Sequence, residues 1–231
     1  MVRPSVIIPG YFATASEYLD VQADLERQGY PTAIVPVQVS NWLVTVGGRP
    51  VTPILRLIDQ TVQTVRERYG SDQVNLIGHS AGGWIARIYL GSHPYDGQRW
   101  HRQEQVSTLI SLGTPHRSRE PWTKNNLGFV NNHYPGAFCP QVKYVCLAGK
   151  GLFGQPFDWQ RWNVGEWFAY TSYELTDGQG SVWGDGITPI PAAHLDGATN
   201  LVFEQVMHSP RGNRLWYGSP TILPQWLNYL D

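Results

Sequence analysis

The sequence predicts an α/β fold with a mostly parallel central sheet flanked by helices, and two observations support this prediction. Short apolar runs alternate along the chain with segments whose apolar residues follow helical spacing. The apolar runs are continuous and do not alternate with polar residues, which is typical of parallel strands that are covered on both faces. Because 231 residues suit one domain of this class, we expect a single domain over 1–231.

The predicted strands and helices follow each other in a regular order. The six strands are expected over 6–10, 32–37, 74–77, 106–112, 143–148 and 201–206. The helices are expected over 16–29, 53–70, 85–91 and 223–230. Ser16 is placed to cap the first helix, and Pro53 suits the first turn of the second because that turn needs no backbone N–H.

Two long segments, at about 115–140 and 150–184, interrupt this alternation, and we interpret them as cap-like insertions. They lack clear periodicity but are too aromatic to be disordered. Their aromatic residues are Trp122, Phe129, Tyr134, Phe138, Phe153, Phe157, Trp159, Trp162, Trp167, Phe168 and Tyr170. Two interpretations remain: a partial lid over an apolar pocket, or a small cap with the tryptophans as its core.

The composition excludes several classes of function. Lys and Arg total 17 against 18 for Asp and Glu, so the chain lacks the basic character of a nucleic-acid-binding protein. Neither a signal peptide nor a membrane-spanning apolar run is recognisable, which predicts a cytoplasmic protein. No H-E-x-x-H motif or credible ligand cluster is present, so we expect no metal and no cofactor. No feature predicts a protein partner.

The run Gly78-His79-Ser80-Ala81-Gly82 matches G-x-S-x-G, and Gly83 follows it. It lies directly between a predicted strand and a predicted helix, where a nucleophilic serine needs small neighbours to occupy a sharp turn. The alternative is a glycine-rich phosphate-binding turn. The spacing is neither G-x-G-x-x-G nor that of a P-loop, and no Lys follows to hold phosphate, so we predict that Ser80 is a nucleophile.

With this motif in its context, the chain resembles the α/β-hydrolase superfamily, and most of all its small lipase and esterase members. The resemblance covers nearly the whole chain and is most specific at 78–83, 112–116 and 184–186. By the family pattern, 112–116 shapes the pocket, and His116 there is a pocket or structural residue and not the catalytic base. The resemblance implies His79, Phe12 and Thr114 as substrate-binding residues.

A serine nucleophile needs an imidazole base and a carboxylate that orients it. In this superfamily the chain order is Ser, acid, His. His208 follows the last predicted strand, where the family places its catalytic histidine, whereas His194 precedes that strand and is better explained as a surface or cleft residue.

For the acid we choose Asp185, because residues 185–189 resemble the family's D-G-x-V-P stretch, with Thr188 in place of the usual Val. Asp177 and Asp158 remain alternatives. The long insertion before Asp185 separates it from the fifth strand, after which a minimal family member carries its acid.

The oxyanion hole of acyl transfer requires two fixed backbone N–H groups. The resemblance implies Ala81, directly after the nucleophile, and Tyr11 in the loop after the first strand, with Phe12 as the alternative to Tyr11. Many relatives carry His-Gly in that loop, whereas this chain has Pro9-Gly10.

Together these residues predict a serine hydrolase that cleaves carboxylic (acyl) esters through a Ser-His-Asp triad and an acyl-enzyme. Two alternatives stay open. One is a thioesterase or acyltransferase that uses the same triad, and the other is a non-catalytic binding module, which a missing triad member would favour. The expected substrate is a small acyl ester or a lipid, and a lipid substrate would bring transient contact with a membrane surface.

Overall fold

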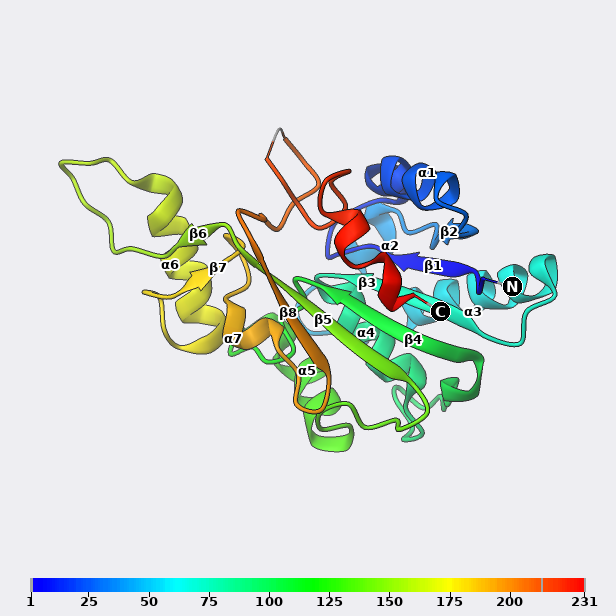
Figure 1. The fold of residues 1–231 in the computed structure, drawn as a ribbon. Coiled ribbons are helices and arrows are strands. Elements are labelled where there is room, and N and C mark those ends of the chain that lie inside the picture. Colours follow the sequence, from blue (N-terminus) through cyan, green and yellow to red (C-terminus); the bar gives the residue numbers. More distant parts are fainter. Residues whose placement is uncertain (1, 213, 231) are drawn as a thin grey trace.

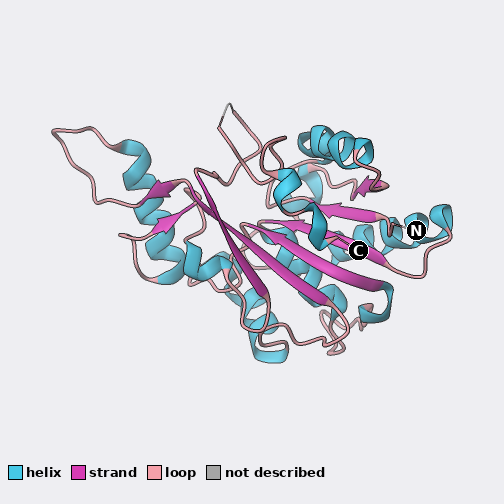
Figure 2. Ribbon diagram, viewed as in Figure 1, coloured by secondary structure: helices cyan, strands magenta, loops and turns pink. Residues whose placement is uncertain are grey.

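A six-stranded parallel sheet forms the centre of the molecule (Figures 1 and 2), as seen in a computed structural model that describes residues 2–212 and 214–230. The side chains of Pro121 and Trp122 are outside this description. The strand order is β2-β1-β3-β4-β5-β8, and every neighbouring pair is parallel. The strands are β1 (Ser5–Ile8), β2 (Thr32–Ile34), β3 (Val74–His79), β4 (Val106–Leu112), β5 (Lys143–Lys150) and β8 (Thr199–Glu204).

Helices cover both faces of the sheet. The helices of the described residues are α1 (Leu19–Arg27), α2 (Val39–Leu43), α3 (Thr52–Tyr69), α4 (Ala81–Leu90), α5 (Pro121–His133), α6 (Val164–Asp177) and α7 (Ile190–Ala193), and α6 lies apart from the sheet. Val6 and Ile8 of β1 join one core with residues of α3 and α4, while Ile7 joins a second core with α1 and the C-terminal segment. The predicted parallel sheet with helices on its faces is therefore confirmed.

The sheet topology brings distant loops to one edge. In a parallel sheet all carboxyl ends lie together, and loops that follow those ends form the binding crevice of open α/β folds. The loop after β1 begins at Pro9, the turn after β3 contains Ser80, and the chain after β8 reaches His208. Residues far apart in the sequence thus become neighbours at this edge.

Two helices occupy segments that the sequence analysis treated as aperiodic. In α5 the buried face mixes the polar Asn126 with Leu127 and Val130, which weakens its apolar pattern. In α6 the buried residues include Ala169 and Tyr173. The helical period was hidden there because the exposed face of α6 is also aromatic, so apolar and polar positions do not separate.

The prediction of a closing helix over 223–230 is wrong. This segment forms two 3₁₀ turns, Leu223–Gln225 and Leu227–Tyr229. So short a segment is not stable as an isolated helix. Packing decides its conformation: Leu223, Trp226 and Leu227 are buried in the second core.

The segment after β5 stands away from the sheet. β6 (Leu152–Phe153) pairs antiparallel with β7 (Trp183–Gly184), and α6 lies between them in the sequence. Figure 1 shows the loop between β6 and α6 as the part that reaches furthest from the sheet.

The aromatic side chains of this loop do not form a buried core. Trp159 and Trp162 are 78% and 65% exposed, and both pack edge-on against Phe157. The interpretation of the tryptophans as the core of a cap is therefore wrong. Within the described ranges, no helix has the combined length and apolar character needed to cross a membrane.

Candidate active site

Ser80 occupies a strained turn between β3 and α4. Its backbone has φ 52° and ψ −122°, a conformation that residues with a side chain rarely adopt. The turn is possible because glycines follow it. A methyl group on Gly82 would lie 2.4 Å from the carbonyl oxygen of Ile8, and one on Gly83 would lie 2.1 Å from Thr114 Oγ1. The backbone after Ser80 therefore packs so closely against β1 and Thr114 that only glycine fits at positions 82 and 83.

Asp185 and His208 form a buried pair. His208 Nδ1 lies 2.8 Å from Asp185 Oδ2, and the backbone N–H of His208 donates to the Asp185 carbonyl at 2.9 Å. Asp185 Oδ1 accepts from the N–H groups of Thr188 at 2.7 Å and Ile187 at 3.0 Å. Since Nδ1 carries the proton toward the carboxylate, the lone pair of a neutral His208 is on Nε2.

Two tyrosines hold the Asp185 turn. Tyr217 donates its hydroxyl proton to Asp185 Oδ2 at 2.6 Å and accepts from the N–H of Gly149 at 2.9 Å. Tyr173 accepts from the N–H of Gly186 at 2.7 Å. Burial by itself would raise the pKa of Asp185, but the charge of His208 and the hydrogen bonds from His208, Tyr217 and Thr188 lower it below its usual value. The carboxyl is therefore ionised near neutral pH.

A second buried chain of hydrogen bonds links the loop after β1 to His208. The N–H of Gly10 donates to the Tyr18 hydroxyl at 3.0 Å, and Tyr18 lies 2.7 Å from His79 Nδ1. His79 Nε2 lies 2.8 Å from the carbonyl oxygen of His208. A carbonyl only accepts, so Nε2 carries the proton and Tyr18 donates to Nδ1. Burial, followed by the charge of His208, lowers the pKa of His79 to about 3, which keeps this ring neutral.

Ser80 and His208 line one small cavity of about 100 Å³, which Gly10 and Tyr11 also line. A methyl group on Gly10 would lie 3.0 Å from Ser80 Cβ, so the loop after β1 runs directly beside the serine. Ala81 begins α4 next to Ser80. In the described part of the chain the Ser80 hydroxyl makes no hydrogen bond, so its contact with His208 is open in this conformation.

Of the three residues expected to contact substrate, two are buried and one is exposed. His79 is buried with both ring nitrogens engaged, so it offers no polar atom to a ligand. Thr114 is also fully buried, and its hydroxyl donates to the Ser80 carbonyl at 2.8 Å. Phe12 is 42% exposed and packs edge-on against Tyr11. His79 lines the cavity shared by Ser80 and His208, whereas Thr114 lies outside its lining and supports the Ser80 turn, and the substrate-binding roles of His79, Thr114 and Phe12 stay predictions.

The alternative acids do not lie against His208. Asp177 pairs with Arg117 at 2.6 Å, and Asp158 pairs with Arg161 at 3.6 Å.

Two other histidines make no hydrogen bond to Asp185, His208 or Ser80 in the described part of the chain. His194 directly follows α7. His116 is buried, and its Nε2 lies 3.3 Å from Cys146 Sγ.

Tyr18, Tyr173 and Tyr217 were not found by sequence reasoning. Each supports the Asp185–His208 pair or the Ser80 turn through its hydroxyl group. No motif contains them, and Tyr217 is 32 residues away from the carboxylate it contacts. Their role depends on tertiary contacts that no spacing rule could have indicated.

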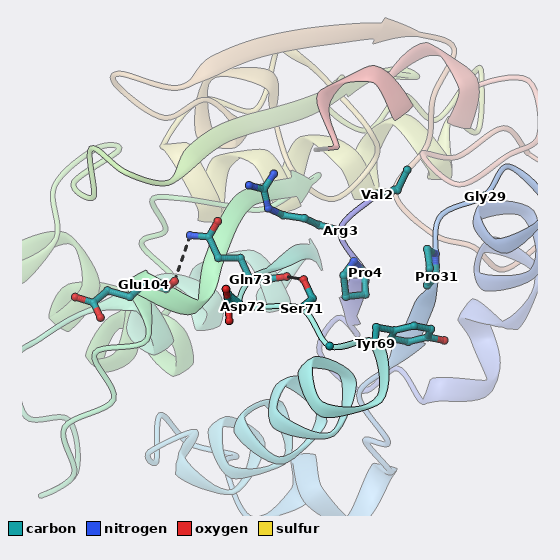
Figure 3. Close-up of a pocket in the computed structure, with 11 residues that line it drawn as sticks. Val2, Arg3, Pro4, Gly29, Pro31, Tyr69, Ser71, Asp72, Gln73 and Glu104 are labelled. Carbon is teal, nitrogen blue, oxygen red and sulfur yellow. Dashed lines mark hydrogen bonds between the residues drawn. The ribbon is translucent and has the colours of Figure 1, made fainter.

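A larger hollow of about 770 Å³ lies at the opposite edge of the sheet (Figure 3). Pro4 and Gln73, which precede β1 and β3, line it, and Gln73 donates to the carbonyl of Glu104 at 3.2 Å. This edge is formed by the amino ends of the strands, and no histidine is among the described residues that line the hollow. In the described residues, no group of three or more His, Cys, Asp and Glu side chains could hold a metal ion.

Comparison with known proteins agrees with this architecture. The profile of the family described as "PGAP1: PGAP1-like alpha/beta domain" matches residues 11–132, more than half of the chain. No curated protein sequence shows significant similarity to the chain.

Solved structures show the same fold. Bacillus licheniformis lipase BlEst2 in its mature form has a TM-score of 0.67 at 17% identity, with 100% of this chain and 92% of that chain covered. The product of the gene lin2722 from Listeria innocua has a TM-score of 0.53 at 13% identity, covering 98% and 93%. An alpha-beta serine hydrolase homologue from Coxiella burnetii has a TM-score of 0.51 at 12% identity, covering 99% and 85%. At these identities the similarity establishes the fold.

Proposed function

The chain belongs to the PGAP1-like α/β domain family within the α/β-hydrolase superfamily, and from this premise we propose that it is a serine esterase acting on carboxylic (acyl) esters. Its lipase-like fold supports hydrolase function in general. The finer proposal is that Ser80, His208 and Asp185 act as nucleophile, base and orienting acid.

One observation carries this proposal: the buried Asp185–His208 pair and the strained Ser80 turn meet at one cavity. A structural aspartate–histidine pair would not require a serine held in a costly backbone conformation beside it. Such strain clusters at functional sites, where it positions a reacting group. The open Ser80–His208 contact is compatible with this role, since catalytic hydrogen bonds often tighten only when substrate is bound.

In the proposed reaction, Ser80 Oγ attacks the ester carbonyl carbon while His208 Nε2 takes the hydroxyl proton. Asp185 stabilises the resulting imidazolium through Nδ1. The tetrahedral intermediate then breaks its bond to the alcohol oxygen, which receives the proton from His208. Water, activated by the same histidine, hydrolyses the acyl-enzyme and regenerates the Ser80 hydroxyl.

The negative oxygen of the intermediate needs two backbone donors. We assign the N–H groups of Ala81 and Tyr11, because Ala81 directly follows Ser80 and Tyr11 lines the cavity beside it. The N–H of Ala81 is also at the start of α4, where the helix dipole favours negative charge. The Gly10–Tyr18 hydrogen bond holds the loop that carries Tyr11.

The test is hydrolysis of p-nitrophenyl esters of increasing acyl length by the unmodified protein and by Ser80→Ala. Ser92→Ala is the matched control, since Ser92 is exposed and lies beyond the far end of α4. We expect Ser80→Ala to lower kcat by roughly 10⁴-fold or more and Ser92→Ala to leave it unchanged.

Equal activity of Ser80→Ala and the unmodified protein would show that Ser80 is not the nucleophile. Absence of turnover on every ester would remove the proposed reaction. A burst of p-nitrophenol that matches the enzyme concentration would support the acyl-enzyme, because acylation releases the phenol before deacylation.

A further inference from the structure

A second cavity lies beside His208. Its volume is about 270 Å³, near the lower end of the range for small-molecule sites. Its walls are mainly apolar and come from four separate segments: Leu152 of β6, Phe168 of α6, Ile187 of the Asp185 turn, and Met207. The polar residues that also line it are Asp185, His208, Ser209, Arg211 and Arg214.

This cavity adjoins the small cavity at Ser80, because the two share lining residues. His208, Ser209 and Arg211 line both cavities. Ser80, Gly10 and Tyr11 line only the small one, whereas Asp185 and the apolar side chains line only the larger one. A ligand that extends from one cavity to the other would therefore pass His208.

The chemistry of acyl transfer distinguishes the two sides of such a ligand. The carbonyl oxygen must lie at the donors beside Ser80, whereas the leaving oxygen must reach the histidine that protonates it. The portion of substrate attached to the leaving oxygen therefore extends on the histidine side. The larger cavity borders the histidine and not the oxyanion loop, so it lies on the side of the alcohol.

We propose that this 270 Å³ cavity binds an apolar alcohol portion of the ester, which makes the protein selective for esters of apolar alcohols. This proposal rests on the proposed esterase function and adds the substrate class. Phe168 is 57% exposed and Ile187 is 37% exposed, so the bound alcohol would cover apolar surface that now faces water.

Gly165, near the start of α6, offers a direct way to fill the cavity. It lines the cavity, and a Cβ at this position would meet no atom within 4 Å. Gly165→Phe places a ring toward the open space, and removal of a helical glycine favours the helix. Gly165→Ala is the matched control because it adds only a methyl group. Gly128→Phe on α5 is a remote control, since that position is equally open.

The experiment compares two isomeric esters, hexyl acetate and ethyl hexanoate, which carry the same chain on the alcohol side or on the acyl side. We expect Gly165→Phe to lower kcat/KM for hexyl acetate by about tenfold or more. Its kcat/KM for ethyl hexanoate should change by less than about twofold. Gly165→Ala and Gly128→Phe should preserve the ratio of the unmodified protein. An equal loss on both esters, a larger loss on ethyl hexanoate, or no loss would overturn the assignment.

A binding measurement separates this proposal from the esterase reaction itself. Saturation-transfer NMR with hexanol should show contact with the unmodified protein, and Gly165→Phe should abolish it. Loss of hexanol binding in a protein that hydrolyses no ester would support the cavity and refute the reaction. Hexanol binding that is unchanged by Gly165→Phe in an active esterase would refute the cavity alone.

Discussion

Replacing Tyr18 with phenylalanine removes one oxygen atom from the buried hydrogen-bond chain between the loop after β1 and His208. Tyr18 is 1% exposed, and its hydroxyl is the acceptor for Gly10 N–H and the donor to His79 Nδ1. In Tyr18→Phe both buried partners lose this contact.

The expected loss of stability follows from these two orphaned groups. A buried polar group without a partner costs about 1–3 kcal/mol, so the free energy of unfolding should fall by roughly 2–6 kcal/mol. This is a large fraction of the ~5–15 kcal/mol typical of a native protein. The variant should nevertheless fold at low temperature, because the phenyl ring keeps the packing of Tyr18 in the second core.

Activity should fall mainly in kcat. The loop that Gly10 anchors carries the proposed oxyanion donor Tyr11, and loss of one such donor costs about 10²–10³-fold in kcat. Because Tyr18→Phe loosens the donor but does not remove it, we expect a loss of about tenfold to a hundredfold, with KM changed much less. The assays are urea unfolding and steady-state ester hydrolysis.

Tyr69→Phe is the matched control, since Tyr69 is 37% exposed and its hydroxyl makes no hydrogen bond in the described part of the chain. Its free energy of unfolding should stay within about 0.5 kcal/mol of that of the unmodified protein. If Tyr18→Phe behaves like this control in both assays, the buried chain does not hold the loop and the reasoning is wrong.

Two further predictions concern the same site. Tyr217→Phe removes a 2.6 Å hydrogen bond to ionised Asp185 and should lower the free energy of unfolding at pH 7 by about 1.5–3 kcal/mol. The pKa of Asp185 is lowered in the folded state, so its carboxylate contributes stability above about pH 3.9 that is lost as pH falls through the folded pKa. Loss of the Tyr217 hydrogen bond raises this pKa in the variant. Denaturant unfolding should therefore show that the difference in free energy of unfolding between Tyr217→Phe and the unmodified protein shrinks toward acid pH. A difference that stays constant with pH would contradict the charge-based account. Gly83→Ala should abolish activity by displacing the Ser80 turn, because its methyl group would lie 2.1 Å from Thr114 Oγ1 and 2.9 Å from Thr114 Cβ, and Gly83→Ala/Thr114→Gly, which removes both atoms, should recover part of the kcat. Absence of recovery in the double variant would show that the clash is elsewhere.

Local signals were sufficient for the sheet and for the Ser80 turn. Continuous apolar runs predicted buried parallel strands because both faces of such strands exclude water, and the structure has these strands at six of the predicted places. The glycine-rich turn could be predicted because the small residues it requires are neighbours of Ser80 in the sequence, between β3 and α4. The helices α5 and α6 were missed because their apolar faces are incomplete or mixed with exposed aromatic residues.

The sequence favoured Asp185 as the acid but left Asp158 and Asp177 as alternatives. The long insertion before Asp185 separates it from the fifth strand, so the position along the chain alone did not exclude the other two. In the structure Asp177 faces Arg117, while Asp185 faces His208.

By itself the sequence determined the fold class, the position of the serine turn, and a small set of histidines and aspartates that could accompany it. These properties depend on periodicity and on neighbours in the chain. Only the tertiary structure decided that Tyr18 and Tyr217 support the site, that His79 and Thr114 are buried beneath it, and that an apolar cavity opens beside His208. A hydrogen bond or a cavity wall depends on where distant segments meet, and folding brings those segments together at the carboxyl edge of the sheet.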